Sequence, residues 1–162
     1  MKAKKVTRRK IATRPKKADF DRNQTALLYL INRCRVVPSR IRLQKLVCLT
    51  EFLHGKNSPF DFGFKSYYYG PYSEELRSTI DRLVGGGQVD ERVVFWEKNG
   101  GETTFSYDYS LTPRGKNVLQ QCVGQLNGQE KAIDAVLSEF GKSPNVAIIK
   151  AAKEASGMES IS

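Results

Sequence analysis

The sequence has no long apolar run, one histidine, one tryptophan, and three cysteines that form no CxxC pair. No segment approaches the ~20 apolar residues that a membrane-spanning helix needs, so we expect no membrane-embedded segment. A single histidine excludes metal sites built from several histidines. Widely spaced cysteines in an odd number are typical of reduced thiols, and we expect Cys34, Cys48 and Cys122 to be buried in a cytoplasmic protein.

The motifs of the common enzyme classes are also missing. The sequence contains no GxxxxGK phosphate loop, no GxGxxG fingerprint, no GxSxG nucleophile turn and no HExxH zinc helix. The best catalytic constellation is Cys48, Glu51 and His54 on one predicted helix. Cys48 and His54 lie about 120° apart around that helix, whereas a Cys-His pair needs direct hydrogen-bond contact. We therefore expect a non-enzymatic protein with no catalytic residue, no cofactor and no metal.

Acidic residues are absent from residues 1–18, which hold nine of the 27 lysines and arginines. The other 18 basic residues nearly balance the 17 acidic ones, so most of the net charge of +10 lies in this tail. We predict a disordered basic tail over 1–18, a single domain over 19–156 and a frayed end over 157–162. The tail suits nucleic-acid phosphates, an anionic membrane surface, a mitochondrial presequence or a purely solubilising role.

Helical and strand-like apolar patterns follow one another along the rest of the chain. The Asn-Gly-Gly sequence at 99–101 is typical of the turn of a β-hairpin, because these residues tolerate positive φ. This order predicts a mainly helical α+β fold, with a winged helix-turn-helix-like core, a β-hairpin wing and extra C-terminal helices over 129–156. The expected elements are helices over 22–34, 40–55, 74–85, 113–126, 129–141 and 144–156, a short strand over 60–65, and hairpin strands over 89–97 and 103–111.

Three segments resemble the YwgA-like proteins: RLQKLVCLTEFLHG at 42–55, FDFGFKSYYYGPYSEEL at 60–76 and YSLTPRG at 109–115. The shared pattern is an LQKLV-L helix, an aromatic strand that ends in YGPYS-EL, and a closing LT--G. The YwgA-like proteins in turn resemble the Panacea, or SocA-like, antitoxin domain. The resemblance covers about residues 22–120. It implies a helical fold with a wing. The relation to the Panacea antitoxin domain implies a toxin as protein partner.

The favoured hypothesis is a nucleic-acid-binding protein with DNA as the expected partner and a role in transcription or its regulation. In a winged helix, the helix before the wing enters the major groove. Here that helix carries Glu74, Glu75 and Asp81 against two arginines, which suits a phosphate-lined groove poorly. We expect contacts with the nucleic-acid backbone from three places: the tail, an acid-free basic cluster in the body, and the wing tip. The residues expected to make these contacts are Lys2, Lys4, Lys5, Arg8, Arg9, Lys10, Arg14, Lys16, Lys17, Arg33, Arg35, Arg40, Arg42, Lys45 and Lys98. For the basic cluster, the alternative is a solvated junction between two helices.

The alternative hypothesis is a protein-interaction module of the Panacea antitoxin type that neutralises a toxin. Its candidate partner-binding residues are Tyr67, Tyr68, Tyr69 and Tyr72, because tyrosines anchor protein interfaces and also stack on bases. Strand alternation predicts Tyr67 and Tyr69 on one face and Tyr68 on the other, and packing in the core is the competing interpretation. The helices over 129–156 cover the core or join two copies in a homodimer, and the sequence does not separate these options.

Overall fold

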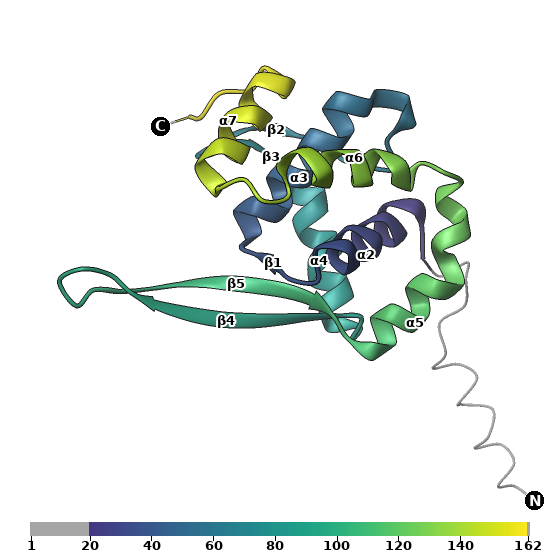
Figure 1. Cartoon of the computed structure of the whole chain (residues 1–162), viewed down its shortest axis with the longest axis horizontal. Helices are drawn as coiled ribbons and strands as arrows, with labels where there is room; N and C mark the ends of the chain where they lie inside the picture. The colour runs from purple at the N-terminus through teal and green to yellow at the C-terminus, as the bar shows by residue number, and fades with distance from the viewer. Residues whose placement is uncertain (1–19, 162) are drawn as a thin grey trace, which may run out of the picture.

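A computed structural model describes residues 20–161, and the predicted tail over 1–18 lies outside the described residues. In Figure 1 a long β-hairpin projects from a helical body. The fold is α+β and mainly helical, with two small antiparallel sheets, which confirms the predicted fold class. Within residues 20–161, no helix is both long enough and apolar enough to cross a membrane.

Every predicted helix is present with closely similar bounds. The one predicted to run to residue 126 changes into a 3-10 turn after Cys122. The helices are α2 (Arg22–Cys34), α3 (Arg40–His54), α4 (Glu74–Gly85), α5 (Pro113–Cys122), α6 (Glu130–Phe140) and α7 (Asn145–Ser156), with 3-10 turns η2 (Gly55–Asn57) and η3 (Val123–Leu126). The strands are β1 (Val37–Pro38), β2 (Lys65–Tyr67), β3 (Gly70–Tyr72), β4 (Val89–Glu97) and β5 (Thr103–Leu111).

Side-chain caps begin four of the helices where the sequence predicts them. At the start of α2, the Asp21 carboxylate accepts a hydrogen bond from the Gln24 amide, and the Gln24 side chain accepts one from the Asp21 amide. Ser39, Ser73 and Thr112 each accept a hydrogen bond from the backbone amide three residues further on. These caps satisfy amide groups that a helix leaves without partners in its first turn.

Helix α2 forms the centre of the hydrophobic core. Its apolar positions Leu27, Leu28, Leu30 and Ile31 are all fully buried, and the helix contacts α5, α6, η3 and β5. Helices α6 and α7 pack against α3 through residues that include Ile133. The C-terminal helices therefore cover the core, and a homodimer formed through their outer faces stays a prediction.

The hairpin β4–β5 has the strand bounds and the turn that the sequence predicts. Its register pairs Val89 with Leu111 at the root and Glu97 with Thr103 at the tip. Strand β1 extends this sheet in the order β1-β5-β4, with Val37 beside Tyr109. The sequence analysis predicted no strand between the helices over 22–34 and 40–55. A strand of two residues that contains a proline carries too little local signal to be predicted, because its partners come from distant β5.

The strand predicted over 60–65 is wrong. Phe60 and Phe62 are buried, as their spacing predicts, but they lie in a loop. Side chains rather than a neighbouring strand satisfy this backbone: the amides of Phe60, Asp61 and Phe62 donate to Ser58, Asn23 and Glu51 respectively. The strand in the structure, β2, starts at Lys65, where the predicted strand ends. The alternation of buried and exposed residues in this segment therefore belongs to a loop that side chains hold in place.

A candidate binding pocket lined by tyrosines

The pocket begins with a tight hairpin formed by β2 and β3. Tyr68 and Tyr69 form the turn, and Gly70 begins the returning strand with φ of +90°. A side chain at Gly70 would be strained by this φ and would also meet the side chain of Lys153 on α7, 2.9 Å from the built Cβ position. The sequence analysis expected no hairpin here, whereas the chain turns at Tyr68 and Tyr69 and pairs with itself.

Helix α3 holds this hairpin through Gln44. The Gln44 amide group donates to the Ser73 carbonyl and accepts from the Ser73 amide, both at 2.9 Å. Both residues are buried, so the pair satisfies two backbone groups that have no water available. Gln44 belongs to the LQKLV segment and Ser73 to the YGPYS segment. Two of the three segments that resemble the YwgA-like proteins are therefore in direct contact.

Lys45, the next residue on α3, is also buried, with 2% of its surface exposed. Its Nζ atom donates to the carbonyl of Pro71 at 2.8 Å. Burial lowers the pKa of Lys45 from 10.5 to about 8, and the nearby charge of Lys153 acts in the same direction. The sequence analysis expected this side chain to contact a nucleic-acid backbone. Lys45 is therefore not part of an exposed basic patch, because its side chain is buried at the inner end of a pocket and bonds to the hairpin backbone.

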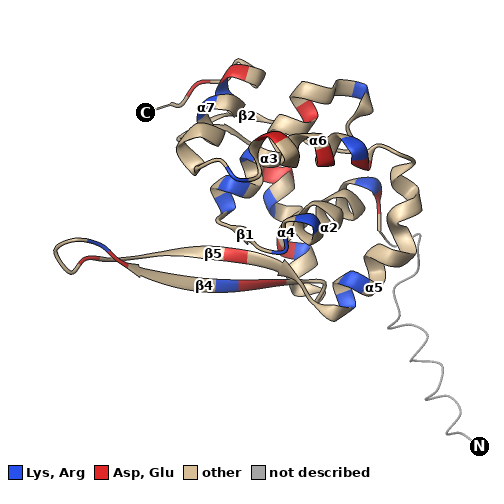
Figure 2. Cartoon of the chain, viewed as in Figure 1, with Lys and Arg blue, Asp and Glu red and all other residues tan. Residues whose placement is uncertain are grey.

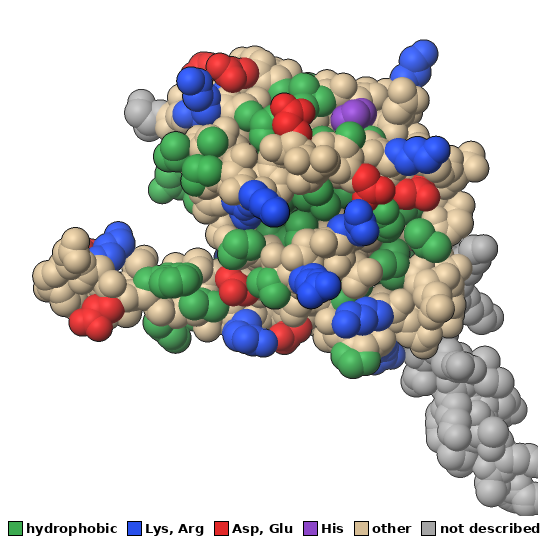
Figure 3. Space-filling model, viewed as in Figure 1, with side chains coloured by type: hydrophobic (Ala, Val, Ile, Leu, Met, Phe, Trp, Pro, Cys, Tyr) green, Lys and Arg blue, Asp and Glu red, His purple; other side chains and the backbone are tan. Residues whose placement is uncertain are grey.

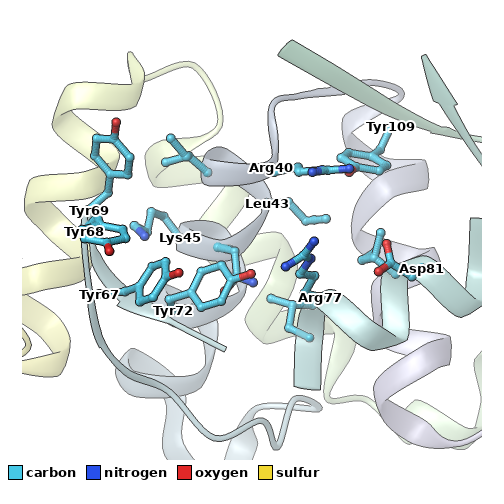
Figure 4. Close-up of a pocket in the computed structure, with 14 residues that line it drawn as sticks. Arg40, Leu43, Lys45, Tyr67, Tyr68, Tyr69, Tyr72, Arg77, Asp81 and Tyr109 are labelled. Carbon is cyan, nitrogen blue, oxygen red and sulfur yellow. The ribbon is translucent and has the colours of Figure 1, made fainter. Parts of the chain in front are cut away.

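A pocket of about 290 Å³ opens between α3, α4 and the β2–β3 hairpin, and we call it the tyrosine pocket. In the view of Figure 4, Lys45 and three tyrosines lie at one end, Arg40 and Tyr109 at the other, and Arg77 between them. The lining is mostly apolar or aromatic. Its residues are Arg40, Ile41, Leu43, Gln44, Lys45, Tyr67, Tyr68, Tyr69, Tyr72, Leu76, Arg77, Ile80, Asp81 and Tyr109.

All four candidate tyrosines line this pocket. Tyr67, Tyr68 and Tyr69 are 42–58% exposed, and Tyr72 is half-buried. Tyr67 stacks on Tyr72 with ring centres 4.6 Å apart and contacts Tyr68 at 4.7 Å. The predicted alternation of faces does not apply to Tyr68 and Tyr69, because these two residues form the turn. For the first three tyrosines, exposure favours an available surface over packing in the core.

A row of aromatic rings continues from the pocket along the projecting β4–β5 hairpin, to which we give the name wing for its shape alone. The Arg40 guanidinium lies 3.8 Å from the centre of the Tyr107 ring, Tyr107 contacts Phe105, and Phe105 contacts its cross-strand partner Phe95. We call Tyr107, Phe105 and Phe95 the aromatic strip. Phe95 and Phe105 are 69% and 55% exposed. Figure 3 shows apolar side chains on the wing, beyond the helical body.

The sequence analysis did not single out Phe95 and Phe105 as functional residues. The length of the hairpin is the feature of the sequence that could have pointed to these exposed residues. Strands of nine residues extend about 30 Å, which is more than the core can cover. The face that is buried at Tyr109 therefore continues into solvent at Phe105.

The basic cluster of the body does not form one exposed patch. Arg33 pairs with Asp134 at 3.1 Å, and Arg42 donates to the carbonyls of Gly141 and Ser143, which ties α3 to the connection between α6 and α7. Binding of nucleic acid by these residues stays a prediction.

Four members of the predicted set that the structure describes are exposed: Arg33, Arg35, Arg40 and Lys98. Arg33 and Arg40 are paired with carboxylates, and Arg40 also lines the pocket. Arg40 donates to the Tyr109 hydroxyl at 2.8 Å and pairs with Glu91 at 3.2 Å, so its charge is already balanced at one edge of the pocket. In Figure 2, charges of both signs are interspersed over the body. Residues 1–18, with Lys2, Lys4 and the rest of the predicted tail contacts, lie outside the described residues.

Cys48, Glu51 and His54 form no catalytic arrangement among the described side chains. Cys48 is fully buried, and burial raises the pKa of its thiol to about 12, which keeps the sulfur protonated and unreactive. No hydrogen bond joins Cys48 to His54 within the described part of the chain. Cys122 is buried as predicted, whereas Cys34 is only half-buried.

Glu51 instead has a structural role that depends on pH. Its carboxylate accepts the amide of Phe62 at 2.8 Å, and burial raises its pKa from 4.5 to about 7. The unfolded chain therefore binds fewer protons than the folded one between pH 4.5 and 7. The contribution of Glu51 to stability is present below this range and is lost as the pH rises through it.

Glu51→Gln is expected to stabilise the protein at pH 8 by about 1–2 kcal/mol, since the glutamine carbonyl still accepts the Phe62 amide without a buried charge. Near pH 5 this advantage should vanish. Urea unfolding at both pH values measures the effect, and Glu139→Gln at an exposed site of α6 is the control. An advantage of equal size at both pH values would contradict the assignment.

No family model matches the chain, and a curated protein from Bacillus subtilis is similar to it in sequence. The uncharacterized protein YwgA of Bacillus subtilis (strain 168) is 34% identical over 103 residues. These residues amount to 64% of this chain and 57% of the relative, so the chain spans little more than half the relative's length. The expected similarity to YwgA is confirmed, and the relative's name states no activity.

Proposed function

We propose that this protein is a non-enzymatic binding protein, and that the tyrosine pocket and the aromatic strip together bind a protein with an acidic surface around an apolar patch. The observation that carries the proposal is the connection between the two features. Tyr109 lines the pocket, Arg40 bridges Tyr109 and Tyr107, and Phe105 and Phe95 follow. Large exposed aromatic side chains are the residues that dominate protein interfaces.

The charge of the chain supports an acidic partner. The net charge is +10, and it lies mostly in residues 1–18, so an acidic protein would be attracted from a distance and would associate faster. The expected antitoxin role of the Panacea type is one form of this proposal, with a toxin as partner. A homodimer through the outer faces of α6 and α7 would use a different surface.

Nucleic-acid binding is the second candidate. It is favoured by the nine basic residues of the tail and by the arrangement of the body, in which two helices, α3 and α4, precede a hairpin and β1 lies beside β5. We interpret this arrangement as a winged helix. DNA contacts and a regulatory role would then depend on the tail, Arg35 and Lys98 more than on Arg42 and Lys45, because these two residues bond inside the protein.

The test is a partner captured on the full chain, identified, purified, and measured again with the purified components. Replacing Phe95 and Phe105 together by serine should weaken its binding at least tenfold, because both rings would be lost from the interface. Val146→Ser on α7 is the matched control, since Val146 is the most exposed of the large apolar residues described, at 78%. Binding should persist in ~0.5 M salt, which screens contacts with nucleic acid.

Equal loss of binding in the Val146 variant, or none in the wing variant, would contradict a partner site on the aromatic strip. Nucleic-acid binding is tested separately, with the intact protein and a form that lacks residues 1–18, on labelled duplex DNA, single-stranded DNA and RNA across a salt series. A site on the folded body predicts that both forms bind, with a smaller salt dependence for the shortened one. Binding that disappears with the tail would leave the protein-partner proposal as the better one.

A further inference from the structure

Lys45 places a positive charge at one end of the tyrosine pocket without an opposite charge to balance it. An ammonium group has three donors, and Nζ uses one of them on the Pro71 carbonyl. Within residues 20–161 no carboxylate lies at ion-pair distance from Nζ, and Lys153 adds a second positive charge nearby. A buried charge is costly unless it is paired. The pocket therefore has a place for an anion.

The rest of the pocket accepts an apolar group. Leu43, Leu76 and Ile80 line it together with the tyrosine rings. Its volume of about 290 Å³ is at the lower limit for small-molecule sites, which suits a single ring or one large side chain. Figure 4 shows the tyrosine rings around the end of the pocket where Lys45 lies. The walls of the pocket are thus mostly apolar and aromatic, and the lining includes the lysine whose ammonium group is buried, Lys45.

We propose that the tyrosine pocket binds a compact apolar or aromatic group that carries a single carboxylate, with the carboxylate paired to Lys45 and the apolar part between the tyrosine rings. Two sources offer this chemistry, the C-terminal residue of a polypeptide and a free small carboxylic acid. The polypeptide source rests on the proposed function, because the partner's end would enter the pocket while its surface covers the aromatic strip.

A carboxylate fits this site better than a phosphate. A phosphate dianion needs several donors, as in sites that combine arginines with backbone amides. Here one ammonium group is buried at the site, Arg40 is already paired with Glu91, and the other guanidinium of the lining, that of Arg77, belongs to an exposed residue. Asp81 contributes a negative charge to the lining. A group with one negative charge would balance Lys45 and would meet less repulsion from Asp81.

The first experiment compares two probes on the unmodified full chain by calorimetry. N-acetylphenylalanine has the ring and the carboxylate, whereas N-acetylphenylalanine amide has the ring alone. The acid should bind about ten- to a hundredfold more tightly than the amide, as expected for a charge-assisted hydrogen bond in a buried site. Equal affinity of the two probes, or no binding of the acid at millimolar concentration, overturns the proposal.

The second experiment removes the charge. Lys45→Met keeps the length of the side chain and should abolish the difference between acid and amide, while Lys142→Met at an exposed site leaves it unchanged. Thermal unfolding of each variant checks that it is folded. The comparison of probes on the unmodified protein stands even if Lys45→Met does not fold. A preference for the acid that survives in a folded Lys45→Met protein overturns the assignment of Lys45.

The source of the carboxylate is separated by a third probe, an eight-residue peptide that ends in phenylalanine with a free carboxylate. Tighter binding of this peptide than of N-acetylphenylalanine supports a polypeptide, and equal binding supports a free acid. The proposal and the proposed function can fail independently. If the Phe95 and Phe105 variant lost partner binding while acid and amide bound equally well, the proposed protein interface would stand. The proposed carboxylate site would then be wrong.

Discussion

Gln44→Leu is expected to lower the free energy of unfolding by about 2–4 kcal/mol, one of the two largest structural effects that we predict. The substitution keeps the apolar stem of residue 44 but leaves the Ser73 amide without a partner and the Ser73 carbonyl with the Arg77 amide alone. Both groups are buried, and an unsatisfied amide costs about 1–3 kcal/mol, to which the lost hydrogen bond to the carbonyl adds about 0.5–1.5 kcal/mol. Urea unfolding at pH 7 measures the loss.

Gln120→Leu provides the matched control, because Gln120 lies at the surface of α5. It should change stability by less than about 0.5 kcal/mol. Hydrogen exchange adds a local measurement: the Ser73 amide should exchange much faster in the Gln44 variant, since its acceptor is gone. Stability equal to that of the control would show that the contact between α3 and the hairpin does not hold the pocket in place.

The second large effect is expected at Gly115 in the first turn of α5. A Cβ atom at this position would lie 2.0 Å from the Gln88 carbonyl oxygen, which is part of the backbone and cannot rotate away. Thr112 binds the same carbonyl and that of Gly87 through its hydroxyl, so this junction is fixed from two sides. Gly115→Ala should therefore destabilise the protein by about 2–4 kcal/mol.

Gly85→Ala is the control for this substitution. Gly85 is the last residue of α4, and no atom lies within 4 Å of a Cβ built there. Alanine at this site should be neutral or slightly stabilising, because it lowers the entropy of the unfolded chain. Thermal unfolding of both variants makes the comparison. A Gly115 variant as stable as the Gly85 variant would mean that β4 and α5 separate easily.

Gln44 and Gly115 both lie in segments that resemble the YwgA-like proteins, and their contacts give these segments a structural role. Gln44 and Lys45 of LQKLV bond to Ser73 and Pro71 of YGPYS, and Gly115 of the LT--G ending lies against the backbone before β4. The motifs therefore join elements that are far apart in the chain. Their residues position the tyrosine pocket, and only some of them line it.

Most of the fold could be predicted because its signals are local. Capping side chains mark where helices begin, and the Asn-Gly-Gly turn sets the register of the wing. The strand predicted over 60–65 failed because an alternating pattern reports which residues are buried and not what their backbone pairs with. In this loop the partners are the side chains of Asn23, Glu51 and Ser58.

The candidate site was predicted less well than the fold. The four tyrosines that were singled out together do line one pocket, and their role in binding stays a prediction, whereas Lys45 was assigned to the surface and is buried. On the sequence it belongs to a basic run, and no pattern of charge along the chain distinguishes a buried lysine from an exposed one. Its burial depends on the β2–β3 hairpin, whose Pro71 carbonyl supplies the acceptor.

By itself, the sequence determined the helices, the wing, the lack of a membrane-spanning pattern and the excess of charge in residues 1–18, since each follows from composition or from neighbours within a few residues. The tertiary structure alone decided which polar groups are buried, which arginines are already paired, and that the tyrosine pocket and the aromatic strip meet at Arg40. The physical reason is that burial and pairing depend on contacts between residues far apart in the chain. Arg40 and Tyr109, for example, are 69 positions apart and share a hydrogen bond of 2.8 Å.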